Sequence, residues 1–453
     1  MKKIILFMST MSPKAGARPY LCPDGERVEG TQTNEAPVKY LLRRYGEEIT
    51  GILCVVSKAC KETLEGKAYS TLEHFRRDIA QFCAESGLPY LEKAGDGDAT
   101  LKEAFLKEID FREDGGSDTE AALVRDVSRE LNPGDEILLE TTGGFRNSVM
   151  LLLMLSRVLS YTGHPTACAV YSFFDRTNQG KDKIFDVSDI AGYFDLIGGM
   201  QELTSFGNVR ALRAYYRRRP HDKRIDRLLD AAQKLLDTIA LCRTKQIPGA
   251  VERFNRAMDN AEACADPLLP QLLPAFREKF GGQMDIPGLI RWCVDSDMVQ
   301  QALTIYKENI PGYLLQRGGV LRVDEDAPLP EGKQEYQSNE EAFFRDFVER
   351  KFYKSAIRGN SWDWRPDQYA GYRVLCGFEA MRRIALDYNY ILLLRNMTNH
   401  AADTVGEKKE WKIQELNDYN HRFKHPKNTT AQDVKDAILS GLKNLNVNRE
   451  GKE

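Results

Sequence analysis

The stretch Asp135–Gly163, "DEILLETTGGFRNSVMLLLMLSRVLSYTG", joins a strand pattern to a helix pattern through a glycine pair. Its beginning, "DEILLE" at Asp135–Glu140, is the short apolar run of a buried strand, and "RNSVMLLLMLSRVLSYTG" has the length of a helix. The threonines and glycines at 141–144 stand between them, where the threonines are expected to cap the helix and the glycines to let the backbone turn. The stretch therefore predicts one strand–turn–helix unit of an α/β sheet.

Similar apolar runs recur before and after this stretch and alternate with helix patterns, as in "TNEAPVKYLLRRYG", for which Thr33 or Asn34 is the expected N-cap. The other predicted strands are Lys3–Met8, Gly51–Ser57 and Thr166–Phe174, with "KIFDVS" as a candidate neighbour of the last. The Gly/Pro-rich segment at 12–30 is predicted to be a loop. Buried strands that alternate with helices predict a parallel, doubly wound sheet. From Leu203 onward the patterns are helical only, so the second half is predicted to be all-α.

The composition is that of a globular protein, with 453 residues, 42% hydrophobic, 29% charged and a formal net charge of −3. This charge gives no overall basic field, which argues against a protein that coats duplex nucleic acid. The nine cysteines show no CxxC or zinc-ligand spacing and are expected to be reduced thiols in the cytoplasm. No apolar run approaches the roughly 20 residues that span a bilayer, so no membrane segment is expected.

Two hydroxyl-rich segments are expected at the same edge of the predicted sheet. Ser9 and Thr10 follow the first strand, and the glycine pair with Arg146 and Asn147 follows the strand that ends at Glu140. Backbone N–H groups and a helix N-terminus at such an edge attract anions, above all phosphate, and ligands of doubly wound sheets bind there. A nucleotide-like ligand is one interpretation, and a capped glycine turn with nothing bound is the other. The segment matches neither GxGxxG nor a Walker motif.

The segment "YILLLRNMTNHAAD" (Tyr390–Asp403) places three polar residues at the end of an apolar helix. Asn396 and His400 are four residues apart and share one helix face, with Arg395 beside it. Histidine can move a proton at a ribose 2′-hydroxyl and arginine can stabilise a phosphorane, so the three residues suit metal-free RNA cleavage. The alternative is a packed helix in which His400 bonds a backbone carbonyl.

The segment "YYRRRPHDKR" (Tyr215–Arg224) is basic and contains aromatic residues. It could guide RNA or an anionic ligand. The alternative is a solvated helix between domains, because charged runs are usually solvated.

Several of these motifs, taken in order, resemble those of one family. "RNMTNH" matches the R-[NH]-x3-H signature of HEPN ribonucleases, and "GLIRWCVDSDMVQQALTIYKENIP" resembles a helical segment upstream of it. "ETTGGFRN" after a strand, with "MST" and "TQTNEAPVKYLL" before it, resembles a CARF sensor domain. The chain as a whole is similar to the CARF–HEPN ancillary ribonucleases of type III CRISPR systems.

The resemblance implies a Rossmann-like CARF domain with a parallel sheet at 1–200, a helical connector at 201–245 and an all-α HEPN domain at 246–453. It implies a homodimer that binds a cyclic oligoadenylate messenger, a cyclic tetra- or hexa-adenylate, and then cuts single-stranded RNA. Cleavage needs no metal or other cofactor and leaves 2′,3′-cyclic phosphate ends. Some relatives also degrade the messenger in the CARF pocket. No membrane contact and no stable complex with the CRISPR effector are expected.

The resemblance also implies roles for individual residues. Arg395 and His400 become the catalytic pair, with Asn396 in support. The residues implied to bind the messenger are Ser9, Thr10, Thr33, Asn34, Thr141, Thr142, Gly143, Gly144, Phe145, Arg146 and Asn147. The loop has Gly143 where many relatives have histidine, which leaves the size of the messenger open. The alternative function is a dimeric regulator that senses nucleotides without catalysis.

Overall fold

The structure is a computed structural model that describes most of the chain. The described residues are 1–93, 99–112, 116–145, 147–175, 181–280, 282–316, 321–323, 348–349, 353, 372–374, 378–400, 414, 416, 423–424 and 429–445. The chain divides into two compact units, Met1–Phe194 and Asp195–Glu453, and the boundary lies inside helix α6, Ser188–Phe206. The three domains at 1–200, 201–245 and 246–453 stay a prediction.

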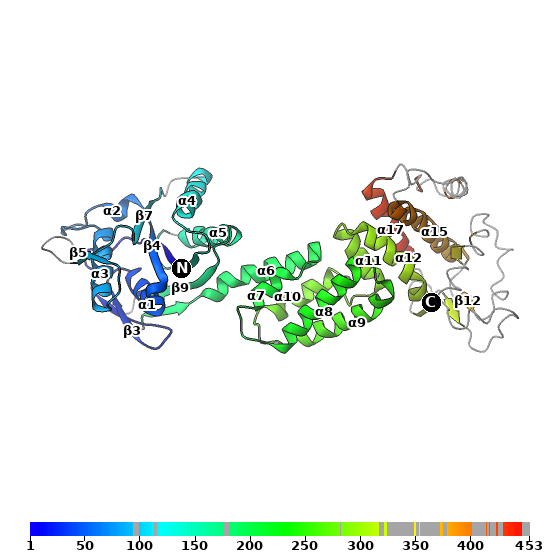
Figure 1. Ribbon diagram of the computed structural model, residues 1–453, viewed down its shortest axis with the longest axis horizontal. Helices are drawn as coiled ribbons and strands as arrows, with labels where there is room; N and C mark the ends of the chain where they lie inside the picture. The colour runs from blue at the N-terminus through cyan, green and yellow to red at the C-terminus, as the bar shows by residue number, and fades with distance from the viewer. Residues whose placement is uncertain are drawn as a thin grey trace. The chain divides into compact units, whose positions relative to one another are not determined.

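The first unit is built on an eight-stranded sheet with the order β3-β2-β10-β9-β8-β1-β4-β7 (Figure 1). The strands are β1 Lys2–Phe7, β2 Arg18–Leu21, β3 Arg27–Gly30, β4 Ile49–Val56, β7 Leu106–Asp110, β8 Glu136–Glu140, β9 Thr166–Phe173 and β10 Lys183–Asp186. The five strands from β9 to β7 are parallel, with Leu6 of β1 opposite both Cys54 of β4 and Glu140 of β8. This confirms the α/β fold class predicted from the alternating patterns.

Helices cover both faces of the sheet because successive β1 side chains point to opposite sides. Ile4 and Leu6 pack in one buried cluster, against α1 Glu35–Tyr45 and α3 Thr71–Glu85. Ile5 and Phe7 pack in another, against α4 Ser117–Arg129 and α5 Ser148–Tyr161. The other elements of this unit are η1 Gly46–Glu48, α2 Lys58–Lys61 and a small antiparallel pair, β5 Leu91–Lys93 and β6 Ala99–Leu101.

The sheet is mixed at one end, where the sequence predicted parallel strands only. β10 runs antiparallel to β9, and β2 and β3 form an antiparallel hairpin inside the segment predicted to be a loop. β2 contains Pro19, which lacks an N–H donor, and meets β10 at a single described register pair, Lys183 with Leu21. Short strands with proline and charged residues carry little strand signal, so the hairpin was not predicted.

The second unit is largely helical, as predicted, and its core has Tyr306, Met381 and Ile391 buried together. Its other helices are α7 Arg210–Tyr216, α8 Lys223–Ala240, η2 Thr244–Gln246, α9 Ile247–Ala261, α10 Leu269–Glu278, α11 Ile286–Asp295, α12 Val299–Gln316, α15 Phe378–His400 and α17 Ala431–Asn444. Two short strands, β11 Leu321–Val323 and β12 Tyr372–Val374, pair antiparallel, so the prediction of a purely all-α half was wrong in this detail. Within the described ranges no helix is long and apolar enough to cross a membrane.

Candidate functional site

The first candidate site lies where β1 and β8 end side by side. The strands are parallel neighbours, but α1, which precedes β4, packs on one face of the sheet and α5, which follows β8, packs on the other. The chain therefore leaves this edge in two directions, and such a switch point is where doubly wound sheets bind ligands.

Asn34 joins the two strand ends. Its side chain is fully buried; Nδ2 donates to the Phe7 carbonyl at 3.0 Å and to the Glu140 carboxylate, and Oδ1 accepts from the Ser9 N–H at 3.0 Å. Asn34 stands at the N-cap position of α1 but makes no capping hydrogen bond through its side chain. The prediction of a capping asparagine is therefore wrong in mechanism, because the amide bonds across to β1 and β8 instead.

Gln32 is a second brace, which the sequence analysis did not single out. Its Nε2 donates to the Ser9 carbonyl at 2.8 Å and to Asn34 Oδ1 at 2.6 Å, while its Oε1 accepts from the Asn34 N–H at 2.7 Å. Glu35 holds the same turn, since Oε2 accepts from the N–H groups of Thr31 at 2.6 Å and of Gln32 at 3.0 Å. Amide and carboxylate side chains thus fix the turn that precedes α1.

Glu140 lies fully buried beneath the site at the last position of β8. Its Oε1 accepts from the Thr142 N–H at 2.8 Å and its Oε2 accepts from Asn34. Burial raises the pKa of this carboxyl to about 7, although the hydrogen bonds from Thr142 and Asn34 act in the opposite direction. The sequence reasoning missed this residue; the available signal was a carboxylate that closes an otherwise apolar strand.

The two glycines allow a close approach between the loop after β8 and the end of β1. A Cβ atom at Gly143 would lie 2.1 Å from Asn34 Nδ2 and 2.2 Å from the Phe7 carbonyl oxygen. Gly144 has a φ of +93°, and a Cβ there would lie 2.7 Å from the Phe7 Cβ. Both positions therefore require glycine, as the sequence predicted for the turn.

The loop N–H groups were predicted to be open to an anion, and two of them are already used. The Thr142 N–H donates to Glu140, and the Gly144 N–H donates to Ser9 Oγ at 2.9 Å. Ser9 is half-buried, whereas Thr10 and Asn147 are exposed at the same edge. The edge therefore presents mainly hydroxyl and amide side chains to solvent.

The threonines do not cap α5, which corrects their predicted role. Thr141 Oγ1 donates to the Val170 carbonyl at 2.9 Å, and Thr142 Oγ1 accepts from the Ser172 N–H at 2.7 Å. Ser172 Oγ in turn donates to the Thr33 carbonyl at 3.2 Å, so the end of β9 is connected to the turn before α1. These bonds bring β1, β8, β9 and α1 together at one edge.

Phe145, Asn147 and Arg146 complete the set of predicted binding residues. The Phe145 ring stacks on Phe111 with centroids 5.3 Å apart and meets Phe7 edge-on at 5.6 Å, so it belongs to the core beneath the loop. Asn147 is the N-cap residue of α5, without a side-chain capping bond. Arg146 lies outside the described residues.

The second candidate site is on α15, which carries Arg395, Asn396 and His400. Arg395 is half-buried, and its Nη1 donates to Asn396 Oδ1 at 3.2 Å. The apolar part of the helix lies in the core, with Ile391 and Leu394 buried. His400 is the last described residue of α15, and its side chain lies outside the described part of the chain.

A groove of about 610 Å³ runs along α15, and neither Arg395 nor Asn396 is among the described residues that line it. Met397 and Thr398 line it, together with Val299 of α12 and with Thr430 and Val434 of α17. Each helical residue turns by about 100°, so Met397 is about 60° from the direction of His400 and Thr398 about 60° from that of Arg395, and the groove borders the predicted catalytic face.

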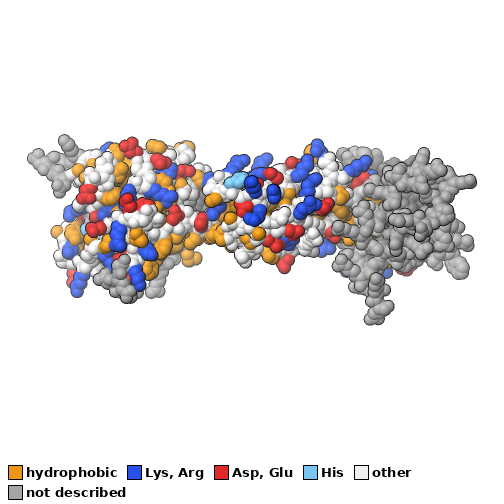
Figure 2. Space-filling view, turned by 90° about the horizontal axis from the view of Figure 1, so that it is seen from below, with side chains coloured by type: hydrophobic (Ala, Val, Ile, Leu, Met, Phe, Trp, Pro, Cys, Tyr) orange, Lys and Arg blue, Asp and Glu red, His pale blue; other side chains and the backbone are white. Residues whose placement is uncertain are grey.

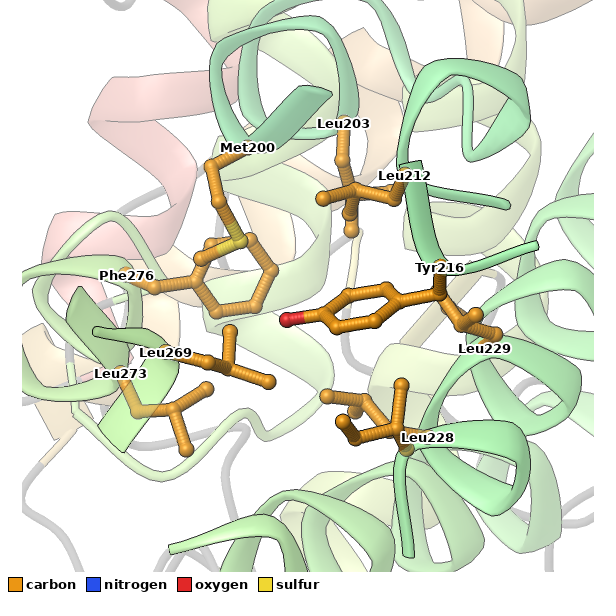
Figure 3. A pocket seen from close by; sticks show the side chains of 11 residues that line it. Met200, Leu203, Leu212, Tyr216, Leu228, Leu229, Leu269, Leu273 and Phe276 are labelled. Carbon is orange, nitrogen blue, oxygen red and sulfur yellow. The ribbon is translucent and has the colours of Figure 1, made fainter. Parts of the chain in front are cut away.

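A small apolar cavity lies among α6, α7, α8 and α10, and Figure 3 shows the side chains that point into it. Its volume is about 10 Å³, which is about the room for one water molecule. It is a packing defect of the helical core rather than a ligand site. No group of three or more His, Cys, Asp or Glu residues suited to a metal ion occurs among the described residues.

Comparisons with known proteins give structural likenesses but no match at the level of sequence. No protein-family model matches the chain, and no curated protein matches its sequence. A solved structure of Enterococcus italicus Csm6 bound to cyclic hexa-2′-fluoro-hexa-dAMP is similar, with 11% sequence identity and a TM-score of 0.34. The match covers 100% of this chain and 96% of that chain.

Proposed function

We propose that the protein is a metal-independent endoribonuclease that cuts single-stranded RNA when a cyclic oligoadenylate binds its α/β unit. The observation that carries the proposal is the arrangement on α15, where Arg395 is hydrogen-bonded to Asn396 just before His400 on a helix anchored in the core. The R-N-x3-H sequence is the signature of HEPN ribonucleases, and its three residues occur here at one end of one helix.

The proposed chemistry uses each residue in a distinct role. His400 takes the proton from the ribose 2′-hydroxyl or gives one to the leaving 5′-oxygen, because an imidazole side chain can serve as either base or acid. The guanidinium of Arg395 stabilises the charge that builds on the phosphorane. Asn396 positions Arg395 by accepting its N–H, so that the fork faces the phosphate in a fixed orientation. The attack leaves a 2′,3′-cyclic phosphate.

The motif holds one histidine, His400, and therefore supplies one proton-transfer group per chain, whereas cleavage uses a base and an acid. A second copy of the chain would supply the other, and we therefore propose a homodimer whose two α15 helices form one composite site. The α/β unit would bind the messenger at the edge made by Ser9, Thr10, Thr33 and Thr142, where hydroxyls can bond ribose and phosphate oxygens. Slow cleavage of the messenger at these hydroxyls would limit the signal.

The test is a cleavage assay with a fluorogenic single-stranded RNA in EDTA, with cyclic tri-, tetra- and hexa-adenylate added separately. We expect one ring to activate cleavage, His400→Ala to abolish it and Thr398→Ala to preserve it. Thr398 is a control on the same helix because its hydroxyl bonds the Leu394 carbonyl at 2.9 Å and has no role in the proposed chemistry. Tight binding of one ring without cleavage would indicate the non-catalytic regulator, and neither binding nor cleavage would refute the proposal.

A further inference from the structure

The helical unit has a strongly basic surface around the connection between α7 and α8. Residues 210–227 contain eight lysines and arginines and only two aspartates, in a chain whose net charge is −3. Figure 2 shows Lys and Arg side chains gathered on one face of the helical part of the molecule. We call the exposed residues Arg217, Arg218, Lys223, Arg224 and Arg227 the basic surface.

The two aspartates of this segment have partners other than the side chains of the basic surface. Asp222 Oδ1 accepts from the Arg224 N–H at 2.8 Å and Oδ2 accepts from the Ala265 N–H at 2.8 Å, and these backbone bonds lower the pKa of its carboxyl. Asp226 pairs with His221 at 2.6 Å. Arg213, by contrast, has its own partner in Asp230 at 2.8 Å. None of the five cations of the basic surface has an ion-pair partner within the described ranges.

The placement of these cations does not help the helix that carries them. Lys223 and Arg224 are the first two residues of α8, where the helix dipole disfavours positive charge. Arg227 lies four residues after Lys223 and three after Arg224, so it repels both along the helix surface. Cations that destabilise their own helix need another explanation, and an anionic partner provides one.

The backbone beneath the basic surface is held in place. Asp266 is buried and accepts from the N–H groups of Leu268 and Leu269, both at 2.9 Å. The hydroxyls of Tyr215 and Tyr216 approach the other carboxylate oxygen of Asp266 at 3.4 and 3.3 Å. The connection between α7 and α8 is thus tied to the start of α10, and the cations are presented from a fixed scaffold.

We propose that the basic surface binds the phosphodiester backbone of single-stranded RNA and holds the substrate on the helical unit. The choice of RNA as the polyanion rests on the proposed function. Arginine forks and lysine ammonium groups bind phosphates without reading bases, so this contact adds affinity and not sequence preference. The binding is therefore expected to weaken strongly with salt, because each phosphate contact releases counterions.

The test measures binding of a fluorescently labelled 20-nucleotide RNA to the His400→Ala protein, which cannot cleave it, at salt concentrations between 50 and 200 mM. The variant adds Lys223→Gln, Arg224→Gln and Arg227→Gln. Loss of three phosphate contacts should reduce the slope of log K against log salt by about 2 and the affinity at 100 mM by roughly 10- to 100-fold. The melting temperature should not fall, since like-charge repulsion is removed.

The control carries the same change in charge on the other unit, through Lys58→Gln, Arg125→Gln and Arg129→Gln. Each of these exposed cations has an acidic neighbour, at 4.0, 3.1 and 3.6 Å. We expect less than a threefold change in RNA affinity.

If the α8 variant binds RNA with the same affinity and the same salt slope as the parent, the inference is overturned and the proposed ribonuclease is unaffected. Loss of RNA binding in a protein that never cleaves RNA would support the surface and refute the ribonuclease. Parallel measurements use vesicles with 30% phosphatidylserine and polyglutamate. The vesicles or polyglutamate could bind in a way that the three substitutions weaken while RNA affinity stays unchanged. That result would assign the surface to a different partner and overturn the inference.

Discussion

Replacing Gly143 by alanine places a methyl group in the contact that joins β8 to β1. The new Cβ atom would lie 2.1 Å from Asn34 Nδ2 and 2.2 Å from the Phe7 carbonyl oxygen, which are themselves bonded at 3.0 Å. One or both must move by more than 1 Å, so this bond and the neighbouring bond to Glu140 are lost. Buried groups left without partners cost about 1–3 kcal/mol each, and overpacking adds about 1–3 kcal/mol. We expect a loss of about 3–6 kcal/mol in the free energy of unfolding.

The assay must report on the α/β unit itself. All four tryptophans lie beyond residue 290, so tryptophan fluorescence follows only the second unit. Amide hydrogen exchange read by mass spectrometry on peptides from β1 and β8 gives the local free energy of opening, and urea unfolding followed by circular dichroism gives the global value. The same variant should lose messenger binding, because Ser9 and the loop after β8 no longer keep their positions.

Gly16→Ala is the matched control, since Gly16 is exposed, has no atom within 4 Å of the added Cβ and does not have a positive φ. It should change the unfolding free energy by less than about 0.5 kcal/mol. A Gly143→Ala protein whose unfolding free energy and exchange rates equal those of the control would refute the reasoning, because the close contact between the strands could not then be real.

Three further outcomes follow from single side chains. The pKa of Glu140, raised to about 7 by burial, means that its contribution to stability is complete below about pH 4.5 and is lost as the pH rises through 7. By linkage this amounts to about 3 kcal/mol, so urea titrations between pH 5.5 and 8 should show a smaller decline for Glu140→Gln than for the parent. Tyr306→Phe removes a buried hydroxyl that has no hydrogen-bond partner in the described structure, and its melting temperature should be equal or higher. Arg395→Lys keeps the charge but loses the planar fork, so the activated cleavage rate should fall by roughly 100- to 1000-fold with messenger affinity unchanged; equal rates would refute the role of Arg395.

Most of the strands that the sequence predicted are apolar runs with largely buried side chains. β1, β4, β8 and β9 are apolar runs between turn signals, and each lies within the parallel part of the sheet. β7 is an edge strand in which only Leu106 and Ile109 are buried, and Lys107 and Glu108 between them made the segment resemble a helix pattern. Whether such a segment forms a strand depends on pairing with segments far away in the sequence. The periodicity of a single sequence carries no information on that pairing.

The position of the candidate site could be predicted, whereas its internal bonds could not. The rule that parallel strands end at one edge placed Ser9 near the glycine pair, and the Gly144 N–H does donate to Ser9 Oγ. Asn34 was expected to cap its own helix, since asparagine at that position usually does. In the structure the Asn34 amide instead bonds across to Glu140. That choice depends on which polar groups become buried together when the sheet folds, so the local sequence does not predict it.

The neutral character of the braces at this edge bears on what it can bind. Gln32 and Asn34 fix Ser9 with amide groups, which add no charge that would repel a phosphate. Two carboxylates contact this network: Glu35, which accepts from the Gln32 N–H, and Glu140, which is separated from solvent by Asn34 and Thr142. Because burial brings the pKa of Glu140 to about 7, this carboxyl can take up a proton when an anion arrives, and the repulsion is then removed at a small cost near neutral pH. A buried acid beneath an amide layer is therefore compatible with a phosphate ligand, whereas an ionised carboxylate with an ordinary pKa in the same place would oppose one.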